Sequence, residues 1–409
     1  MKRLLIIFLF CSVGMAVFAQ SANMSYYNNE YMRPGGTFND RLLVLESVRD
    51  AGMTGIGEFY HEALKFLILK IPDIRTHEDR EATVNAARIL CQGLGAENYS
   101  AAAPELWQIV VFSDVVRDAA NEGLLMQDAL VALGQVDGRD FVTHIALRLD
   151  NFNTDVVSDV ETRRRVQRGV VGCISALEAF QELEGYNPVF FASVGWYDPA
   201  IRTIARLALP NILEDPEPII SEIIRNPGNN PSIKFTAWEE MLFSSAPDAS
   251  KARVAAIALA AGWSYSTNDP SFQRILREMR ISAIETIRIL GVEDDSVYAN
   301  LERSYSNNFI SSTPFYDEIL ATLNALSVIR TDEAVDILFR FLAELHLRRQ
   351  LGPWGNKERQ VFQWILPSIG ATKTQSEEVR HLLTTIQRSQ DYTGTEHVWA
   401  RDALRELDS

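Results

Sequence analysis

The feature that most constrains this fold is a pair of short amphipathic segments that recurs along the chain. In the clearest copy, apolar residues at helical spacing occupy 126–133, a break falls at 134–138, and a second apolar stripe occupies 141–152. Apolar residues three and four positions apart form one face of an α-helix. The pattern therefore predicts two helices of about three turns joined by a tight turn.

The same layout returns along the chain, while the period-two alternation typical of strands is absent. Clear copies lie at 276–305, 319–345 and 361–386, with breaks at 291–295, 328–331 and 370–374, and weaker copies lie near 81–115, 170–194 and 237–260. Their turns are about 40 to 60 residues apart, a period typical of stacked helix pairs. The longest interval has room for an extra pair that begins at Asp198-Pro199. We predict an all-α fold, an α-α superhelix of about nine helix pairs over residues 39–409.

Some segments resemble a known repeat family. Gln127–Val136, followed by a short Asp-Gly turn and a second amphipathic helix, resembles a HEAT repeat, and Glu285–Gly291 is a looser match. Pro210 and Pro367 are compatible with the proline kink that first helices of HEAT repeats often carry. The spacing of the helix pairs resembles that of the family over most of the chain, whereas the residue motif resembles it in only one or two repeats. It implies a right-handed HEAT-like (armadillo-like) solenoid that acts as a scaffold, with no catalytic residues.

The first residues have the pattern of a secretory signal peptide, which we assign to residues 1–19. Lys2 and Arg3 precede an apolar run from Leu4 to Phe18, and cleavage is expected near Ala19. The run is shorter than the roughly 18 to 20 residues that span a bilayer, and no later stretch is long and apolar enough. We therefore expect a periplasmic or secreted protein with no transmembrane segment after cleavage of the signal.

Residues 20–38 are polar and aromatic, contain Pro34-Gly35-Gly36, and show no helical period. We interpret them as a flexible leader in front of the helical domain at 39–409. The tyrosines at 26, 27 and 31 could make this leader a peptide that folds on contact with a partner. At the other end of the chain, an apolar stripe through Val398, Ala400, Leu404 and Leu407 predicts a closing helix.

The formal net charge of −15, together with 47% hydrophobic residues, describes a well-packed acidic protein. Nucleic acid is not an expected partner, because phosphate binding needs a large basic surface. Two cysteines follow the signal, Cys91 and Cys173, and each lies among apolar residues at helical spacing. They are interpreted as buried thiols, and a disulfide between them stays open in an oxidising compartment.

The sequence carries no motif that predicts an enzyme, a metal or a cofactor. No two histidines share the i, i+4 spacing of a zinc protease, and phosphate-binding and nucleophile-elbow motifs are missing. His61 follows Glu58 by three residues and precedes Glu62, and we interpret this segment as a solvated helix surface rather than a metal site. We therefore predict a non-catalytic protein without cofactor.

One enzyme class stays open as an alternative. Exported (α/α)-toroid enzymes that act on carbohydrate are also all-helical and use two carboxylates with aromatic platforms. Candidate pieces are 196–198, 238–240 and 263–265, each of which starts with tryptophan. A core or capping role explains Trp238 and Asp198 equally well. A second alternative is a peptidoglycan-binding or small-ligand-binding module.

Candidate partner-binding residues come from basic islands and from one tryptophan in a turn. Arg164 and Arg165 form one island, Arg348 and Arg349 form another, and both stand out on an acidic chain. Trp354 lies among turn residues where no helical stripe forces it inward, and exposed tryptophan is a frequent interface anchor. A solvated helix face, or a tryptophan folded back on the core, are the alternatives. Together with the resemblance, these features predict an exported HEAT-repeat scaffold that mediates protein–protein interaction in the bacterial cell envelope.

Overall fold

The computed structural model describes residues 24–116, 122–292 and 294–409. Within these ranges the chain consists of helices joined by turns and loops, and it contains no β-strand. The predicted all-α class is therefore confirmed. The chain divides into two compact units, Met1–Glu214 (unit 1) and Asp215–Ser409 (unit 2). The predicted organisation, with one helical domain over 39–409, does not include this division.

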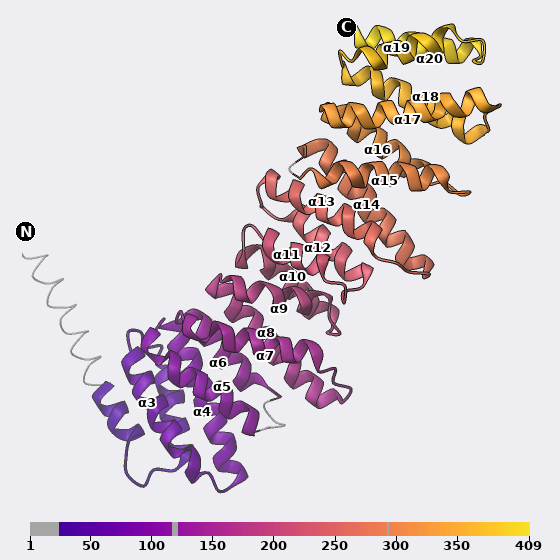
Figure 1. The fold of residues 1–409 in the computed structure, drawn as a ribbon. Helices are drawn as coiled ribbons and strands as arrows, with labels where there is room; N and C mark the ends of the chain where they lie inside the picture. The colour runs from indigo at the N-terminus through magenta and orange to yellow at the C-terminus, as the bar shows by residue number, and fades with distance from the viewer. Residues whose placement is uncertain (1–23, 117–121, 293) are drawn as a thin grey trace, which may run out of the picture. The chain divides into compact units, whose positions relative to one another are not determined.

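Unit 1 is built from helices that follow one another through short connections. Its helices and 3-10 turns are α2 (Phe38–Asp50), α3 (Gly57–Lys70), η1 (Ile71–Asp73), α4 (His77–Ala96), η2 (Ser100–Ala102), α5 (Ala103–Val116), α6 (Leu124–Gln135), η3 (Arg139–Phe141), α7 (Val142–Thr154), α8 (Val160–Phe180), α9 (Leu183–Val194) and α10 (Pro199–Ile212). The helices α2, α4, α6, α8 and α10 form one row, since each contacts the next in that order. On the other side α3 contacts α5, and α7 contacts α9, as can be followed in Figure 1.

Unit 2 repeats this alternation of contacts. Its helices are α11 (Glu217–Arg225), α12 (Pro231–Phe243), α13 (Asp248–Ser264), α14 (Pro270–Leu290), α15 (Ser296–Ile310), α16 (Tyr316–Ile329), α17 (Asp332–Leu351), α18 (Asn356–Thr372), α19 (Glu377–Arg388) and α20 (Gly394–Leu407). The even-numbered helices from α12 to α20 contact one another in order, and so do the odd-numbered helices from α11 to α19 (Figure 1). Each helix of unit 2 therefore packs against the next but one, and most also pack against a neighbour in sequence.

The predicted breaks coincide with the ends of helices. The breaks at 134–138, 291–295, 328–331 and 370–374 separate α6 from α7, α14 from α15, α16 from α17, and α18 from α19. Two helices, α10 and α11, occupy the interval after Asp198-Pro199, with Pro199 in the first turn of α10, but α10 belongs to unit 1 and α11 to unit 2. These turns are local, so a break in the apolar stripe is enough to predict them.

Glycines allow α6 and α8 to approach closely. A Cβ atom added to Gly134 would lie 3.0 Å from the Cα of Ala176, and one added to Gly172 would lie 3.1 Å from the Cα of Gln127. Backbone atoms at that distance cannot move aside without shifting the helix, whereas the end of a flexible side chain can. The absence of a side chain at Gly134 therefore lets α6 pack closely against α8.

The interpretation of 20–38 as a flexible leader is wrong for the part that the structure describes. Residues 24–31 are helical, and the side chain of Tyr31 is fully buried. The Tyr31 ring packs edge-on against Phe59 and Phe66 of α3. Burial against a later helix therefore orders a segment that has no helical period of its own. The signal peptide assigned to 1–19 lies outside the described residues.

The closing helix is present as α20, but its buried face is not the predicted one. Ala400 and Leu407 are buried as expected, whereas Val398 is 40% exposed and Leu404 is only half-buried. Ala403 and Glu396 are buried instead, because the face of α20 is set by its contacts with α18 and α19. An apolar stripe on a terminal helix therefore predicted the helix correctly and its orientation only in part.

Both cysteines are buried free thiols, as predicted, and they do not form a disulfide. Burial raises the pKa of Cys173 to about 12 and raises that of Cys91 as well. Thiols in such surroundings are unreactive. Among the described residues, no helix combines the length and apolar character that crossing a membrane requires.

Candidate functional site

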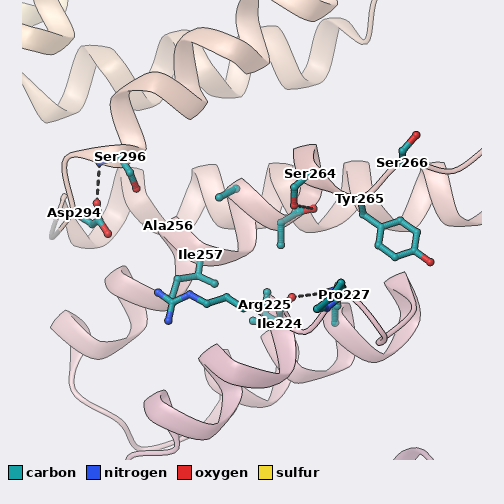
Figure 2. Close-up of a pocket in the computed structure, with 13 residues that line it drawn as sticks. Ile224, Arg225, Pro227, Ala256, Ile257, Ser264, Tyr265, Ser266, Asp294 and Ser296 are labelled. Atoms are coloured by element: carbon teal, nitrogen blue, oxygen red, sulfur yellow. Dashed lines mark hydrogen bonds between the residues drawn. The ribbon is translucent and has the colours of Figure 1, made fainter.

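Unit 2 contains an open cavity of about 510 Å³ where the ends of several helices meet (Figure 2). Its wall combines the C-terminal end of α11, the first turn of α12, one side of α13 and the start of α15. Ala256, Ile257 and Ala260 of α13 give it an apolar floor. This volume lies in the range of cavities that bind small molecules or single side chains of a partner.

Arg225, the last residue of α11, supplies a positive charge to this cavity. Its side chain is exposed and extends past Ile257 toward the end of the cavity where Asp294 lies (Figure 2). The Asp294 carboxylate accepts a hydrogen bond from the backbone N–H of Ser296 at 2.8 Å. That bond, with a smaller contribution from the Arg225 charge, lowers the pKa of Asp294. Within the described part of the chain, no carboxylate forms an ion pair with Arg225, so its guanidinium can receive a ligand.

Lys234 holds the opposite wall in place. It lies in the first turn of α12, is only 3% exposed, and donates hydrogen bonds to the backbone carbonyls of Ile224 and Asn226, the latter at 2.6 Å. These carbonyls are at the end of α11, where unpaired C=O groups and the helix dipole favour a cation. Burial lowers the pKa of Lys234. This lysine therefore fixes the end of α11, and with it the position of Arg225.

Hydroxyl groups complete the lining. Tyr265 and Ser266 follow α13 at the end of the cavity away from Asp294, and the Ser264 hydroxyl donates to the carbonyl of Ala261 at 3.2 Å (Figure 2). None of the described lining residues is a histidine or a cysteine, and Asp294 is the single carboxylate among them. The site is therefore suited to bind an anionic group beside an apolar one.

The predicted basic island on α8 lies in unit 1 and is engaged within the chain. Arg164 is exposed and pairs with Glu122 at 3.3 Å. The backbone of Arg165 lies against the turn before α6, since a Cβ atom on Gly123 would come within 2.8 Å of its carbonyl oxygen. The Arg165 side chain borders a small cavity of about 20 Å³. The residues of this island therefore hold α8 in contact with the turn before α6.

The second predicted island, on α17, is also engaged within its unit. Arg348 pairs with Glu344 at 2.8 Å and lies 4.9 Å from the centre of the Phe309 ring. The Arg349 Nε atom donates to the carbonyl oxygen of Asp391 at 2.6 Å. Both arginines keep part of their surface exposed, but each already has an intramolecular partner.

Trp354 folds back onto the core of unit 2 and does not project as an anchor. Its indole N–H donates to the carbonyl of Leu345 at 3.2 Å, and its ring packs against Phe362 and Tyr392 at centroid distances of 4.7 and 5.5 Å. The Arg349 guanidinium lies 5.4 Å from the ring. The structure therefore brings Arg349 and Trp354 together, and it places neither at the cavity of Arg225.

The same cluster contains His346, and burial makes the protonation of this histidine less favourable. His346 stacks on Tyr392 and its Nδ1 atom shares a hydrogen bond with the Tyr392 hydroxyl at 2.8 Å. Burial lowers the pKa of His346, and nearby Asp391 offsets this only in part. A histidine with a depressed folded pKa contributes stability that is complete above its unfolded pKa of about 6.5 and is lost as pH falls through the folded value.

We therefore expect the thermal midpoint of the chain to fall as pH is lowered below about 6.5, with a small part of that fall due to His346. The variant His346→Gln keeps a polar group but cannot become charged, so it should lose less stability over this window. The comparison of thermal melts of both proteins between neutral and mildly acidic pH tests this. Equal acid sensitivity of the two proteins would contradict it.

The tryptophan triplets considered for a carbohydrate enzyme are mostly structural. Trp238 is fully buried and donates to the hydroxyl of Ser282 at 3.1 Å. The indole N–H of Trp196 donates to the carbonyl of Phe152 at 3.0 Å. Only the third triplet reaches the cavity, through Tyr265. A glycosidase needs two carboxylates, and the described lining offers one.

The interpretation of His61 as part of a solvated surface is wrong. Its side chain is 8% exposed, and the Nε2 atom lies 3.0 Å from a carboxylate oxygen of Glu105 on α5. Glu58 and Glu62, the neighbours considered in the sequence, are both exposed. No group of metal-binding side chains assembles within the described ranges. His61 thus ties α3 to α5, because the packing of α5 brings Glu105 to it.

Sequence reasoning missed both Arg225 and Lys234. The local signal at this place is the segment 226–231, rich in proline, glycine and asparagine, which predicts a turn between two helices but no binding site. No family model, no curated protein and no solved structure matches this chain.

Proposed function

We propose that this chain is an exported, non-catalytic scaffold that binds a protein partner in the bacterial cell envelope, and that its helix pairs form a right-handed HEAT-like solenoid. The observation that carries the proposal is the alternating packing within each unit, where most helices contact the next but one and also a neighbour in sequence. Such arrays expose long surfaces that suit protein binding. The signal-like start of the chain and the Ala-Leu-Gly segment at 132–134 support export and the repeat family, respectively.

The cavity of unit 2 is the docking site in this proposal. The Arg225 guanidinium has no carboxylate partner in the described chain, and the floor beside it is apolar. A partner segment that carries one carboxylate next to an apolar side chain would fit both features. The net charge of −15 repels a polyanion at a distance, so we expect a single acidic group rather than an acidic run.

Charge reversal at Arg225 tests the docking site. The chain would be used as bait in crosslinked envelopes of its native cells, as the wild type, as Arg225→Glu and as Arg388→Glu. Arg388 is a matched control, because it is also an exposed arginine at the last residue of a helix in unit 2. We expect one defined protein to be recovered with the wild type and the control, and to be reduced about tenfold with Arg225→Glu, equivalent to about 1.4 kcal/mol.

Each outcome has a distinct meaning. Recovery of no protein by the wild type would contradict the scaffold function itself. Equal recovery by all three proteins would leave the scaffold in place and remove the cavity from the interface. Equal loss with Arg225→Glu and Arg388→Glu would indicate a general charge effect and would also remove the cavity.

A further inference from the structure

A second cavity, in unit 1, has the features of a ligand site that does not depend on the proposed scaffold function. It has a volume of about 510 Å³ and lies where the loop 33–37 meets α2 and the end of α3. Met32, Phe38 and Phe66 give it apolar walls, and Arg41 of α2 lies within it. Cavities of this size with a few polar groups are typical of sites for small organic molecules.

Arg41 is buried, with only 5% of its surface exposed. Its Nη1 atom donates to the carbonyl of Gly36 at 2.5 Å, and its guanidinium carbon lies 5.1 Å from the centre of the Phe66 ring. The Nε atom is buried and has no hydrogen-bond partner. In the described residues no hydrogen bond is formed by Nη2 either, and no carboxylate pairs with this side chain. A buried charge in this condition is costly unless an anion compensates it.

The other charged groups at this cavity are already engaged, and among them Arg33 pairs with Glu30 at 3.6 Å. Lys70 pairs with Asp73 at 3.0 Å, and the Asp79 carboxylate accepts the backbone N–H of Thr76 at 3.3 Å as part of a helix cap. Asp40, next to Arg41 in sequence, is exposed and accepts the backbone N–H of Thr37 at 2.9 Å. None of these carboxylates is therefore committed to Arg41.

The buried hydroxyl of Tyr31 cannot supply a negative charge to Arg41. The hydroxyl of Tyr31 is buried without a hydrogen-bond partner, as Nε of Arg41 is. Burial raises the pKa of Tyr31 well above its ordinary range, and the charge of Arg41 opposes this only in part. Tyr31 thus stays neutral at physiological pH and supplies no counter-charge to Arg41.

We propose that this cavity binds a small organic carboxylate, with the carboxylate on the guanidinium of Arg41 and an apolar body against Phe38 and Phe66. A guanidinium with free N–H groups recognises carboxylate by charge-assisted hydrogen bonds. The apolar walls distinguish such a ligand from a bare inorganic anion, since they favour a hydrocarbon body by removing it from water. The site would thus bind both the charged end and the apolar end of an amphiphilic molecule.

The probe for this proposal is hexanoate, with hexan-1-ol and inorganic phosphate as comparisons. Hexanol keeps the apolar body without the charge, and phosphate keeps the charge without the apolar body. We expect ligand-detected NMR and thermal shift of the full chain to report binding of hexanoate, at least about tenfold tighter than either comparison. Hydrogen exchange should be slowed by hexanoate in the segment 33–41, which locates the effect at this cavity.

Variants test the role assigned to Arg41. Arg41→Met removes the charge at similar length and should weaken hexanoate binding at least about tenfold, whereas Arg49→Ala, at an exposed residue of α2 outside the cavity lining, should leave it unchanged. Arg41→Lys keeps a charge without the planar fork and should bind at an intermediate level. Circular dichroism would establish that each variant is folded. The hydrogen-exchange experiment uses the wild type alone, so it tests the site even if a variant does not fold.

Four results would overturn the proposal. These are hexanoate binding retained in a folded Arg41→Met variant, hexanol binding as tightly as hexanoate, phosphate binding as tightly as hexanoate, or slowed exchange that spares 33–41. Because none of these readouts involves a protein partner, failure here leaves the scaffold function untouched, and failure of the scaffold function leaves this site untouched.

Discussion

Replacing Arg280 with alanine is expected to lower the free energy of unfolding of unit 2 by about 3–5 kcal/mol. The Arg280 guanidinium forms two hydrogen bonds with the carboxylate of Glu318 on α16, at 2.7 and 2.9 Å. It also donates to the carbonyl of Gly262 at 2.9 Å and lies 3.9 Å from the centre of the Trp263 ring. The two charged side chains are 8% and 0% exposed. Truncation of Arg280 would leave the Glu318 carboxylate buried without its partner, which is far more costly than the loss of a surface pair.

Hydrogen exchange of α14 and α16 during urea titration of the full chain measures this loss within unit 2. Arg274→Ala is the control, since Arg274 is on the same helix, is 72% exposed and pairs with Glu278 at 3.8 Å. Its replacement should change stability by no more than about 0.5 kcal/mol. The double variant Arg280→Met/Glu318→Leu removes both charges and should recover most of the stability. A loss below about 1 kcal/mol for Arg280→Ala would show that water already reaches Glu318.

Replacing Gly134 with valine is expected to destabilise unit 1 by about 1–3 kcal/mol through overpacking. Already the first added carbon would meet the Cα of Ala176 at 3.0 Å and the Cβ of Ala179 at 3.1 Å. The two γ-methyl groups of valine would reach further into α8. The helices α6 and α8 would then have to separate, and the packing between them would be lost. Urea unfolding of the variant, with hydrogen exchange of α6 and α8, gives the magnitude.

Gly394→Val is the matched control for this experiment. Gly394 is the first residue of α20, and a Cβ atom added there meets no atom within 4 Å. The same substitution should therefore change stability by less than about 0.5 kcal/mol. Equal losses at the two glycines would mean that backbone propensity, rather than contact with α8, limits Gly134.

The helices and their connections follow from local patterns in the amino-acid sequence. Apolar stripes at helical spacing gave the helix pairs, and glycine, proline and capping residues marked the breaks, because a helix and a turn depend on residues a few positions apart. The thiols of Cys91 and Cys173 were predicted as buried for the same reason. These features need no knowledge of which helices become neighbours.

Which side chains meet depends instead on how the helices pack. Arg225 and Asp294 come together because α11, α13 and α15 pack side by side, and their residues are far apart in sequence. The burial of Tyr31 and the partial burial of Trp354 depend on rings contributed by other helices, so the leader segment and the turn both pack against the core. The positions of helices and turns follow from residues a few positions apart. Charge compensation and burial depend on contacts between residues that are far apart in sequence, and no local spacing specifies those contacts.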